Sequence, residues 1–254
     1  TRTGYNFNGW CTVQVADNAS CTGTSYSAGS NYTINYATSN TFTLYARWSI
    51  KTSAITLNGN GATNTFTSST TATYFSTTLG ALTTLPARNS TTNTRTVSGL
   101  TATGTGADGA TVTFPSSGNC TSTSNCKSTS TTSYTFNGWH KDSGTGTLIA
   151  NTATTPALKP STTYTDANSK WTYTGNVTLY AGWDSSSTSY TSLTLPSINK
   201  QGYSCGWDTN QSATTYTYNS GASITPASSM TLYGICKANN YNITFNFDSN
   251  ISNI

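Results

Sequence analysis

The sequence has few of the residues on which most enzymes depend. Charged residues make up 7% of the 254 positions, glutamate is absent, and the single histidine is His140. A serine-type triad would need His140 with its neighbour Asp142, which lies too close in sequence for the usual geometry. The aspartates are dispersed, so no glycosidase-like pair of carboxylates stands out. We therefore expect no enzyme activity, no catalytic residue and no cofactor, and we interpret His140 as an exposed residue at a strand end.

Other classes of partner are also disfavoured. The basic residues give a net charge of +4 but are scattered one at a time, whereas phosphate binding needs a clustered patch. No apolar run approaches the length of a membrane span. The Cys-x-x-Cys spacing typical of zinc sites is missing, and His140 is near no cysteine in sequence. The sequence thus predicts no nucleic-acid partner, no membrane insertion within this segment and no metal site.

Good helix formers are scarce, and β-branched threonine is abundant, so any helix should be short. A chain so rich in threonine, serine, asparagine and glycine could be disordered. Aromatic residues nevertheless make up 12% of it and fall at regular places, which argues for a folded chain. The predicted fold class is all-β to β-rich α+β.

What the sequence does contain is a pair of aromatic signatures that occurs three times in the same order. The first signature is GYNFNGW, SYTFNGW or, one residue shorter, GYSCGW, at 4–10, 133–139 and 202–207. The second is TLYARW, TLYAGW or TLYGIC, at 43–48, 178–183 and 231–236. Self-similarity of this kind predicts an array of like units.

Both signatures have the pattern of strands. In the second, Phe42, Leu44, Ala46 and Trp48 share one face. In the first, the glycine before the tryptophan predicts a bulge that turns the indole inward. We expect the signature residues to form module cores, with their tryptophans largely buried: Tyr5, Phe7, Trp10, Trp48, Tyr134, Phe136, Trp139, Trp183, Tyr203 and Trp207.

The combination of Tyr-x-Phe-x-Gly-Trp with Thr-Leu-Tyr-Ala-x-Trp resembles the internalin-type B-repeat, also called the Listeria-Bacteroides repeat. Units of that family usually open with a strand ending in Asn-Gly, which residues 54–61 (AITLNGNG) resemble. The resemblance implies small β-grasp-like modules in tandem on bacterial surface and secreted proteins, acting as stalks or adhesive segments. It covers residues 1–50, 54–87, 133–184 and 190–247, and leaves 88–132 without a counterpart.

The resemblance divides the chain into four parts. Residues 1–50 are a partial module without its opening strand, and residues 51–184 are a module with a β insertion at about 88–132. Residues 185–240 form a compact module. Residues 241–254 are the opening strand of a following module or a donated strand.

The six cysteines lie as neighbours in sequence, each pair inside one module or inside the insertion. Cys205 takes the place of the phenylalanine and Cys236 that of the last tryptophan, two residues that should touch in the other copies. Fifteen connectivities are possible in principle. The register of the repeats favours Cys11–Cys21, Cys120–Cys126 and Cys205–Cys236. Disulfides imply an oxidising setting, so we expect an extracellular, cell-surface or secreted protein.

The leading functional hypothesis is a non-catalytic structural or adhesive repeat segment of a bacterial surface protein or filament. Residues 241–247 alternate like an opening strand, whereas 1–50 lack one. We therefore expect head-to-tail contacts with neighbouring repeats or subunits by strand addition. The alternative is a module that binds a glycan or another host ligand through the insertion at 88–132 and through exposed aromatics such as Tyr45, Tyr180 and Trp171.

Overall fold

In the computed structural model, residues 1–33, 41–102, 109–114, 120 and 126–246 are described. Regular secondary structure in these residues consists of strands, and no helix occurs among them. The all-β part of the prediction is therefore confirmed. The physical reason is local, because threonine-rich stretches with alternating aromatic residues suit a pleated sheet.

The chain folds into two compact units, each made of two segments. Unit 1 comprises Thr1–Ser90 and Ser133–Ser186, and unit 2 comprises Thr91–Thr132 and Ser187–Ile254. Residues 88–132 are therefore not an insertion into the middle module, as the sequence analysis expected. Almost all of them belong with the C-terminal part of the chain.

The N-terminal sheet of unit 1 has three antiparallel strands in the order β2-β1-β3. Their bounds are Tyr5–Cys11 for β1, Ser25–Tyr26 for β2 and Tyr45–Ile50 for β3. The register between β1 and β3 shifts between Phe7 and Trp10, where Gly9 has a φ of 91°. This shift confirms the expected bulge, and glycine suits it because a side chain is strained at such a φ.

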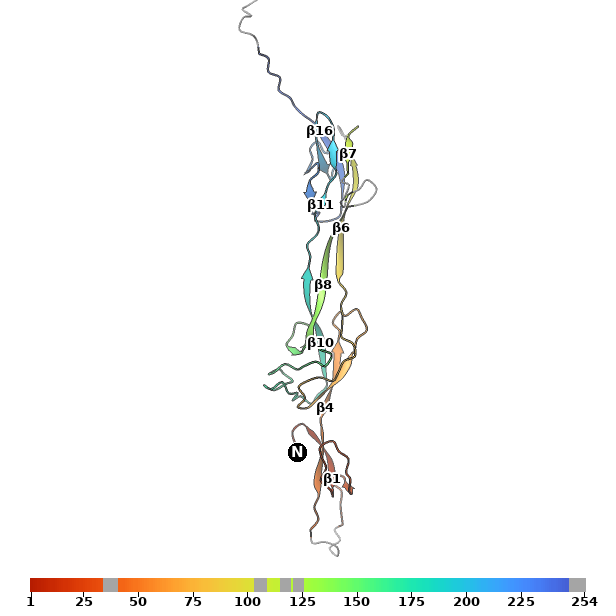
Figure 1. Ribbon diagram of the computed structural model, residues 1–254, viewed down its shortest axis with the longest axis vertical. Coiled ribbons are helices and arrows are strands. Elements are labelled where there is room, and N and C mark those ends of the chain that lie inside the picture. Colours follow the sequence, from red (N-terminus) through yellow and green to blue (C-terminus); the bar gives the residue numbers. More distant parts are fainter. Residues whose placement is uncertain (34–40, 103–108, 115–119, 121–125, 247–254) are drawn as a thin grey trace, which may run out of the picture. The chain divides into compact units, whose positions relative to one another are not determined.

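The second sheet of unit 1 has the order β9-β8-β10-β4-β5. The strands are β4 (Thr52–Asn58), β5 (Ser69–Thr73), β8 (Cys126–Lys141), β9 (Leu148–Ala150) and β10 (Val177–Ser187), of which β8 enters unit 1 at Ser133. β4 and β10 run parallel, whereas β4 and β5 are antiparallel (Figure 1). Buried residues alternate along β4, so one of its faces covers the core of the unit.

The core of unit 1 lies under this sheet. Its largest fully buried side chains are Trp139, Trp171, Ile55, Leu79, Ile149 and Leu179. Trp171 lies in a connection outside the strands of the sheet, and its indole N–H donates to Ser53 Oγ on β4 over 3.1 Å. Because Trp171 has no exposed surface, the idea that it presents a platform for a ligand is wrong.

The main sheet of unit 2 has the order β14-β13-β16-β6-β8, and it includes the first part of β8. Its other strands are β6 (Thr91–Ala102), β13 (Tyr203–Asp208), β14 (Tyr218–Asn219) and β16 (Met230–Ala238). Two short pairs complete the unit, β7 (Thr111–Thr113) with β12 (Ser197–Asn199) and β11 (Leu193–Thr194) with β15 (Ser223–Ile224). The core contains Trp207, Leu193, Leu195, Leu232, Val97, Cys205 and Cys236.

Strand β6 explains why residues 91–132 belong to unit 2. In unit 1, β4 runs parallel to the start of β10, with Val177 opposite Ile55. In unit 2, β6 has the same place beside β16, with Met230 opposite Val97. Each of these strands has an antiparallel partner on its other side, β5 for β4 and the first part of β8 for β6. The third signature pair therefore has an antiparallel strand pair equivalent to β4 and β5. In sequence, this strand pair comes before the two signatures of the second copy.

Asp208, at the end of β13, should make the stability of unit 2 sensitive to acid. Its carboxylate accepts hydrogen bonds from the Thr217 hydroxyl and from the backbone N–H groups of Asn210 and Thr217, which lower its pKa. A lowered pKa in the folded state adds stability above the unfolded value of about 3.9, and this stability is lost as the pH falls through the folded value. We expect Asp208→Asn to weaken unit 2 at neutral pH and to flatten the loss below about pH 4.

The measurement is urea unfolding of unit 2 at a series of pH values, with the carboxyl titration of Asp208 followed by NMR. Thr217→Val is the companion variant, because it removes the first of these donors and should raise the pKa part of the way. An Asp208 pKa at its ordinary value in the parent chain would contradict this account.

Candidate functional site

The three signature copies place equivalent residues opposite each other across two strands. Phe7 pairs with Trp48, and their ring centroids are 5.2 Å apart. Phe136 and Trp183 have centroids 5.9 Å apart. In the third copy Cys205 pairs with Cys236 in register, and the two sulfurs are bonded. A disulfide thus stands where the other two copies have an aromatic contact, as the sequence predicted.

The tryptophan of the first signature also has an equivalent place in each copy. Phe7 and Trp10 make an edge-to-face contact with centroids 5.2 Å apart, and Phe136 and Trp139 do the same at the same distance. The tryptophan then pairs with a short outer strand, Trp10 with Tyr26, Trp139 with Ala150 and Trp207 with Tyr218. In the third copy, β13 pairs with β16 without a register shift, which agrees with its signature being one residue shorter.

The three copies differ in how far the aromatic residues of their first signature are exposed to solvent. Trp139 and Trp207 have no exposed surface, whereas Trp10 and Phe7 are each 37% exposed. The expectation that Trp10 and Phe7 are buried is therefore wrong. Trp139 belongs to a cluster with Ile55 and Leu57 of β4, and Phe66 packs on that cluster. The remaining signature residues Tyr5, Trp48, Tyr134, Phe136, Trp183 and Tyr203 are half-buried.

An open strand edge accounts for this difference. β10 and β16 each carry a parallel strand on the side away from their first-signature strand, namely β4 and β6. β3 is the last strand of its sheet, and within the described residues no strand pairs with its other side. β3 begins at Tyr45, and residues 42–44 lead into it without forming a strand. We call the outer side of residues 42–46, which includes this approach to the strand, the β3 edge.

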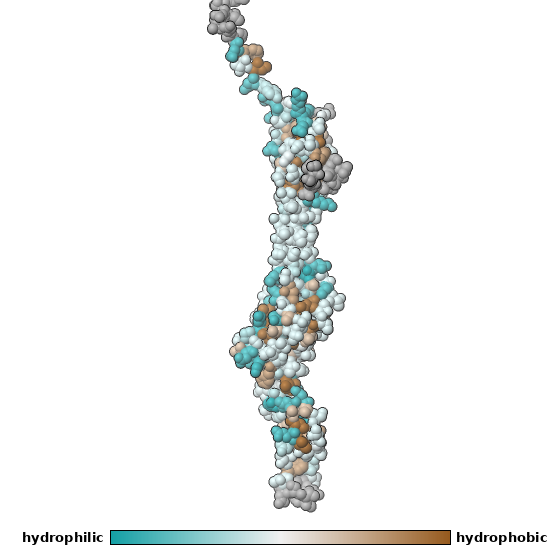
Figure 2. Space-filling model, in the orientation of Figure 1, coloured by the Kyte–Doolittle hydropathy of each residue, from teal (hydrophilic) through white to brown (hydrophobic). Residues whose placement is uncertain are grey.

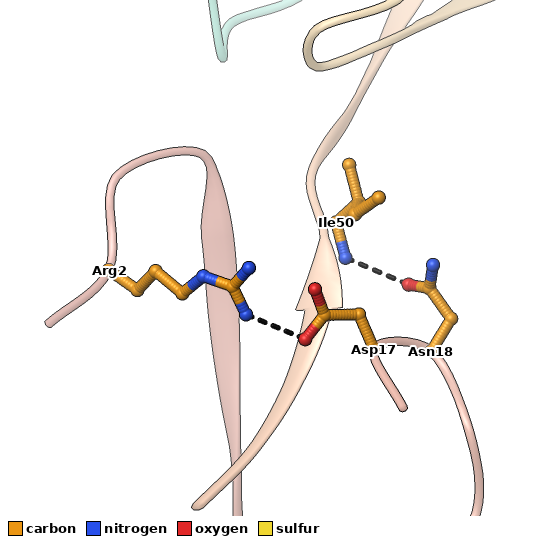
Figure 3. A network of polar contacts seen from close by, with 4 residues as sticks. All are labelled: Arg2, Asp17, Asn18 and Ile50. Atoms are coloured by element: carbon orange, nitrogen blue, oxygen red, sulfur yellow. Dashed lines mark hydrogen bonds and ion pairs between the residues drawn. The ribbon is translucent and has the colours of Figure 1, made fainter. Parts of the chain in front are cut away.

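Asn18 covers the end of β3 beyond this edge (Figure 3). Its backbone N–H donates to the carbonyl of Trp48 over 2.8 Å, and its side-chain oxygen accepts from the N–H of Ile50 over 2.8 Å. The neighbouring Asp17 forms an ion pair with Arg2 at 2.6 Å, and both side chains are partly exposed. The loop at 17–18 therefore ends the open part of the strand at Trp48.

Exposed large apolar side chains are concentrated in the first signature copy, which contains the β3 edge. Six of them in residues 1–50 are between 37% and 45% exposed: Phe7, Trp10, Val13, Tyr32, Phe42 and Tyr45. Figure 2 shows hydrophobic atoms at the surface of the part of the chain that contains β1. Tyr32 and Phe42 stack with centroids 4.7 Å apart, so part of the group is already ordered. Exposed apolar side chains that cluster on a surface are typical of interaction sites.

A second exposed apolar element follows β16. Residues 241–246 form no strand, and Tyr241, Ile243 and Phe245 are each 75% exposed. The sequence Asn242-Ile243-Thr244-Phe245-Asn246 resembles Ala54-Ile55-Thr56-Leu57-Asn58 of β4 at corresponding positions. The rest of the predicted terminal strand, from Phe247 onward, lies outside the described residues.

Unit 1 also contains a pocket of about 480 Å³ beside the N-terminal sheet. Aromatic side chains of Tyr5, Phe7, Trp48 and Tyr74 line it, together with the cations of Arg2 and Lys51. The Arg2 guanidinium lies 3.6 Å from the centroid of the Tyr5 ring. None of the three aromatics suggested for ligand binding, Tyr45, Tyr180 and Trp171, lines this pocket.

His140 is buried, not exposed as the sequence suggested. Its Nδ1 lies 2.8 Å from the carbonyl oxygen of Gly146, and its Nε2 lies 3.0 Å from Oδ1 of Asn137. The register shift next to it, between Trp139 and His140, accounts for its inward position. In the described part of the chain, no three metal-binding side chains lie close enough together to hold an ion.

All three expected disulfides are present. Cys11 bonds with Cys21, Cys120 with Cys126, and Cys205 with Cys236. Such bonds form and persist in oxidising compartments, which agrees with an extracellular setting. Within the described residues, no helix has the length and apolar character needed to cross a bilayer.

Comparisons with protein families, with curated proteins and with solved structures found no match for this chain. The resemblance to the internalin-type B-repeat therefore stays a prediction from the signatures. What the structure adds is the equivalent pairing of the three copies and the open edge of the first.

Proposed function

We propose that this chain is an extracellular structural segment of a bacterial surface protein or filament, built from three like β modules and without catalytic activity. One observation carries the proposal: a single cross-strand position is occupied by Phe7 with Trp48, by Phe136 with Trp183 and by the Cys205–Cys236 disulfide. A module used several times in one chain is typical of stalks and fibres, because each added unit extends the array without new chemistry.

The side chains of the β6–β8 ladder support a mechanical role. From Thr91 to Thr96 and from Lys127 to Thr132, these paired strands consist mostly of threonine and serine. Hydroxyls bond across them, for example Thr92 with Thr131 at 3.2 Å. Ser128 of β8 also donates to the carbonyl of Thr191, which lies outside the ladder. This part of unit 2 is held by backbone and hydroxyl hydrogen bonds, and it needs little apolar surface.

Resistance to proteases tests the proposal. We expect the chain to survive prolonged digestion under non-reducing conditions and to be degraded much faster after reduction, because each disulfide adds about 2–4 kcal/mol of stability. Cleavage of a folded domain follows the population of its open state, which reduction should increase by at least about thirtyfold. The half-life of the intact chain is the measurement. Equally rapid digestion in both conditions would contradict a structural role.

Ligand binding in the pocket of unit 1 is a second candidate function. The aromatic walls and Lys51, together with Arg2, whose charge is partly offset by Asp17, suit an anionic ligand with one apolar face, such as an acidic sugar. A glycan array tests this with the parent chain and with Trp48→Ala and Lys51→Gln. Tyr173→Ala is the control, because Tyr173 is an exposed aromatic that does not line the pocket.

A further inference from the structure

We propose that the β3 edge accepts residues 241–246 of a second copy of this chain as a parallel strand, so that copies join head to tail. The inference rests on the proposed structural role and names its partner. Its two elements are the open side of residues 42–46 in unit 1 and the exposed segment that follows β16 in unit 2.

In unit 1, the strand β10 is equivalent to β3, and its outer edge is covered by β4. There, β4 lies parallel to β10, with Ile55 opposite Val177, Leu57 opposite Leu179 and Asn58 opposite Tyr180. Side chains of β4 alternate strictly between buried and exposed. Ile55 and Leu57 belong to the core cluster that contains Trp139, so the strand both pairs with the edge and covers the tryptophan.

Residues 241–246 have the sequence that this position needs. Aligned with β4, Tyr241, Ile243 and Phe245 fall on the buried face, whereas Asn242, Thr244 and Asn246 fall on the exposed face. The segment carries no charge, so its pairing would bury no ion. An exposed extended-type sequence that alternates large apolar and polar residues is the kind of segment that adds to a sheet edge as a strand.

The register follows from the second signature. Phe42, Leu44 and Tyr45 correspond to Val177, Leu179 and Tyr180, because TLYARW and TLYAGW align without a gap. The proposed strand therefore places Ile243 opposite Phe42 and Phe245 opposite Leu44. Asn18 does not obstruct this pairing, since its bonds are to Trp48 and Ile50, which lie beyond the paired stretch. The added side chains would cover the exposed Trp10, as Ile55 and Leu57 cover Trp139.

A short connection joins residues 241–246 to β16, and we take the β3 edge of a second copy as their partner. β16 ends at Ala238, and the N–H of Asn239 donates to the carbonyl of Gly202 over 2.9 Å. Only Asn240 then separates this anchored residue from Tyr241, and one residue extends the chain by about 3.5 Å. The segment thus begins next to the end of β16, and its apolar side chains are exposed and available to a neighbouring molecule. Because donor and acceptor are different surfaces, such a contact repeats from copy to copy.

Four forms of the full chain test the proposal: the parent, Ile243→Lys, Thr244→Lys and Leu44→Lys. Mass is measured by sedimentation velocity over a range of concentrations. We expect the parent to form a series of oligomers, and Ile243→Lys to weaken the association by more than about tenfold because it buries a charge. Thr244→Lys is the matched control, since its side chain lies on the exposed face, and it should associate like the parent.

Complementation decides the direction of the contact. Ile243→Lys keeps an intact β3 edge, and Leu44→Lys keeps an intact donor segment. Each variant alone should be monomeric, whereas a mixture of the two should give one-to-one dimers and nothing larger. Phe42→Lys replaces Leu44→Lys if circular dichroism shows that the latter unfolds, because Phe42 is 41% exposed.

Three results would overturn the proposal: a parent chain that stays monomeric at every concentration, association that Ile243→Lys leaves unchanged, or no dimer in the mixture. Pairing of the segment within its own chain would give the first of these. A monomer that still resists proteases in the non-reduced state would leave the proposed structural role standing and remove the strand-addition contact alone.

Discussion

Replacing Trp139 by alanine should lower the free energy of unfolding of unit 1 by about 3–5 kcal/mol, the range found when a large buried aromatic is truncated. Trp139 has no exposed surface, and it packs against Phe136 and Phe66 with ring centroids 5.2 Å and 6.4 Å away. Buried residues such as Ile55 and Ile149 belong to the same cluster, so the cavity left by its removal is closed to solvent and the surroundings can collapse only in part.

Trp10→Ala is the matched control, because Trp10 has the same place in the first signature copy. Its side chain is 37% exposed, and it loses the contact with Phe7 but leaves no closed cavity. We expect a cost of less than about 1.5 kcal/mol for this variant. Urea unfolding followed by circular dichroism measures both. Equal costs for the two variants would show that the two copies are covered alike in solution.

A comparison of Trp139→Phe with Trp207→Phe separates the cost of lost side-chain volume from the cost of a lost hydrogen bond. The indole N–H of Trp139 is buried and, within the described structure, has no hydrogen-bond partner, whereas that of Trp207 donates to the carbonyl of Pro196 over 2.8 Å. Trp207→Phe leaves that buried carbonyl without its partner, which adds about 1–3 kcal/mol to the packing cost. Trp139→Phe lacks this penalty, so it should be the milder of the two substitutions.

The sequence predicted local features well where they depend on neighbouring residues. The bulge at Gly9 and the pairing of Cys205 with Cys236 both follow from counting residues along alternating strands. The six cysteines could be paired correctly for the same reason, because each pair lies within one copy or one loop.

The features that it missed depend on residues distant in sequence. β6 is the opening strand of the third copy, but its Val97-Ser98-Gly99 does not resemble the Ile-Thr-Leu-Asn of β4, and the chain returns to unit 1 between β6 and β13. The prediction that Trp10 is buried was wrong for a related reason. The signature sets which way the indole points, but another strand decides whether anything covers it.

The strand that covers a signature therefore decides whether its tryptophan is buried. Two copies have such a strand from within the chain, and in both the tryptophan is fully buried. The first copy has the equivalent three strands and shares the Phe–Trp contacts with the second copy, but its strand edge is open among the described residues. The surface that we propose for interaction is therefore the strand edge that β4 and β6 cover in the other two copies.

Removing the Cys205–Cys236 disulfide should destabilise unit 2 more than removing either of the others destabilises its own region. The sequence separation is 31 residues, against 10 for Cys11–Cys21 and 6 for Cys120–Cys126. The chain-entropy relation gives about 3.7, 2.7 and 2.2 kcal/mol for loops of these lengths. The double alanine variant of Cys205 and Cys236 should lose somewhat more, since both side chains are buried in the core of unit 2.

The double variant Cys205→Phe with Cys236→Trp tests whether this position is equivalent to the aromatic pairs in the other copies. We expect it to recover part of the stability that the double alanine variant loses, because the two rings can restore apolar contact across the strands. Recovery should be incomplete. Cys205 and Cys236 are 9% and 4% exposed, whereas Phe136 and Trp183 are only half-buried, so two large rings overfill the site. Both variants are compared by urea unfolding, and a Phe–Trp pair no more stable than the alanine pair would contradict the equivalence of the three positions.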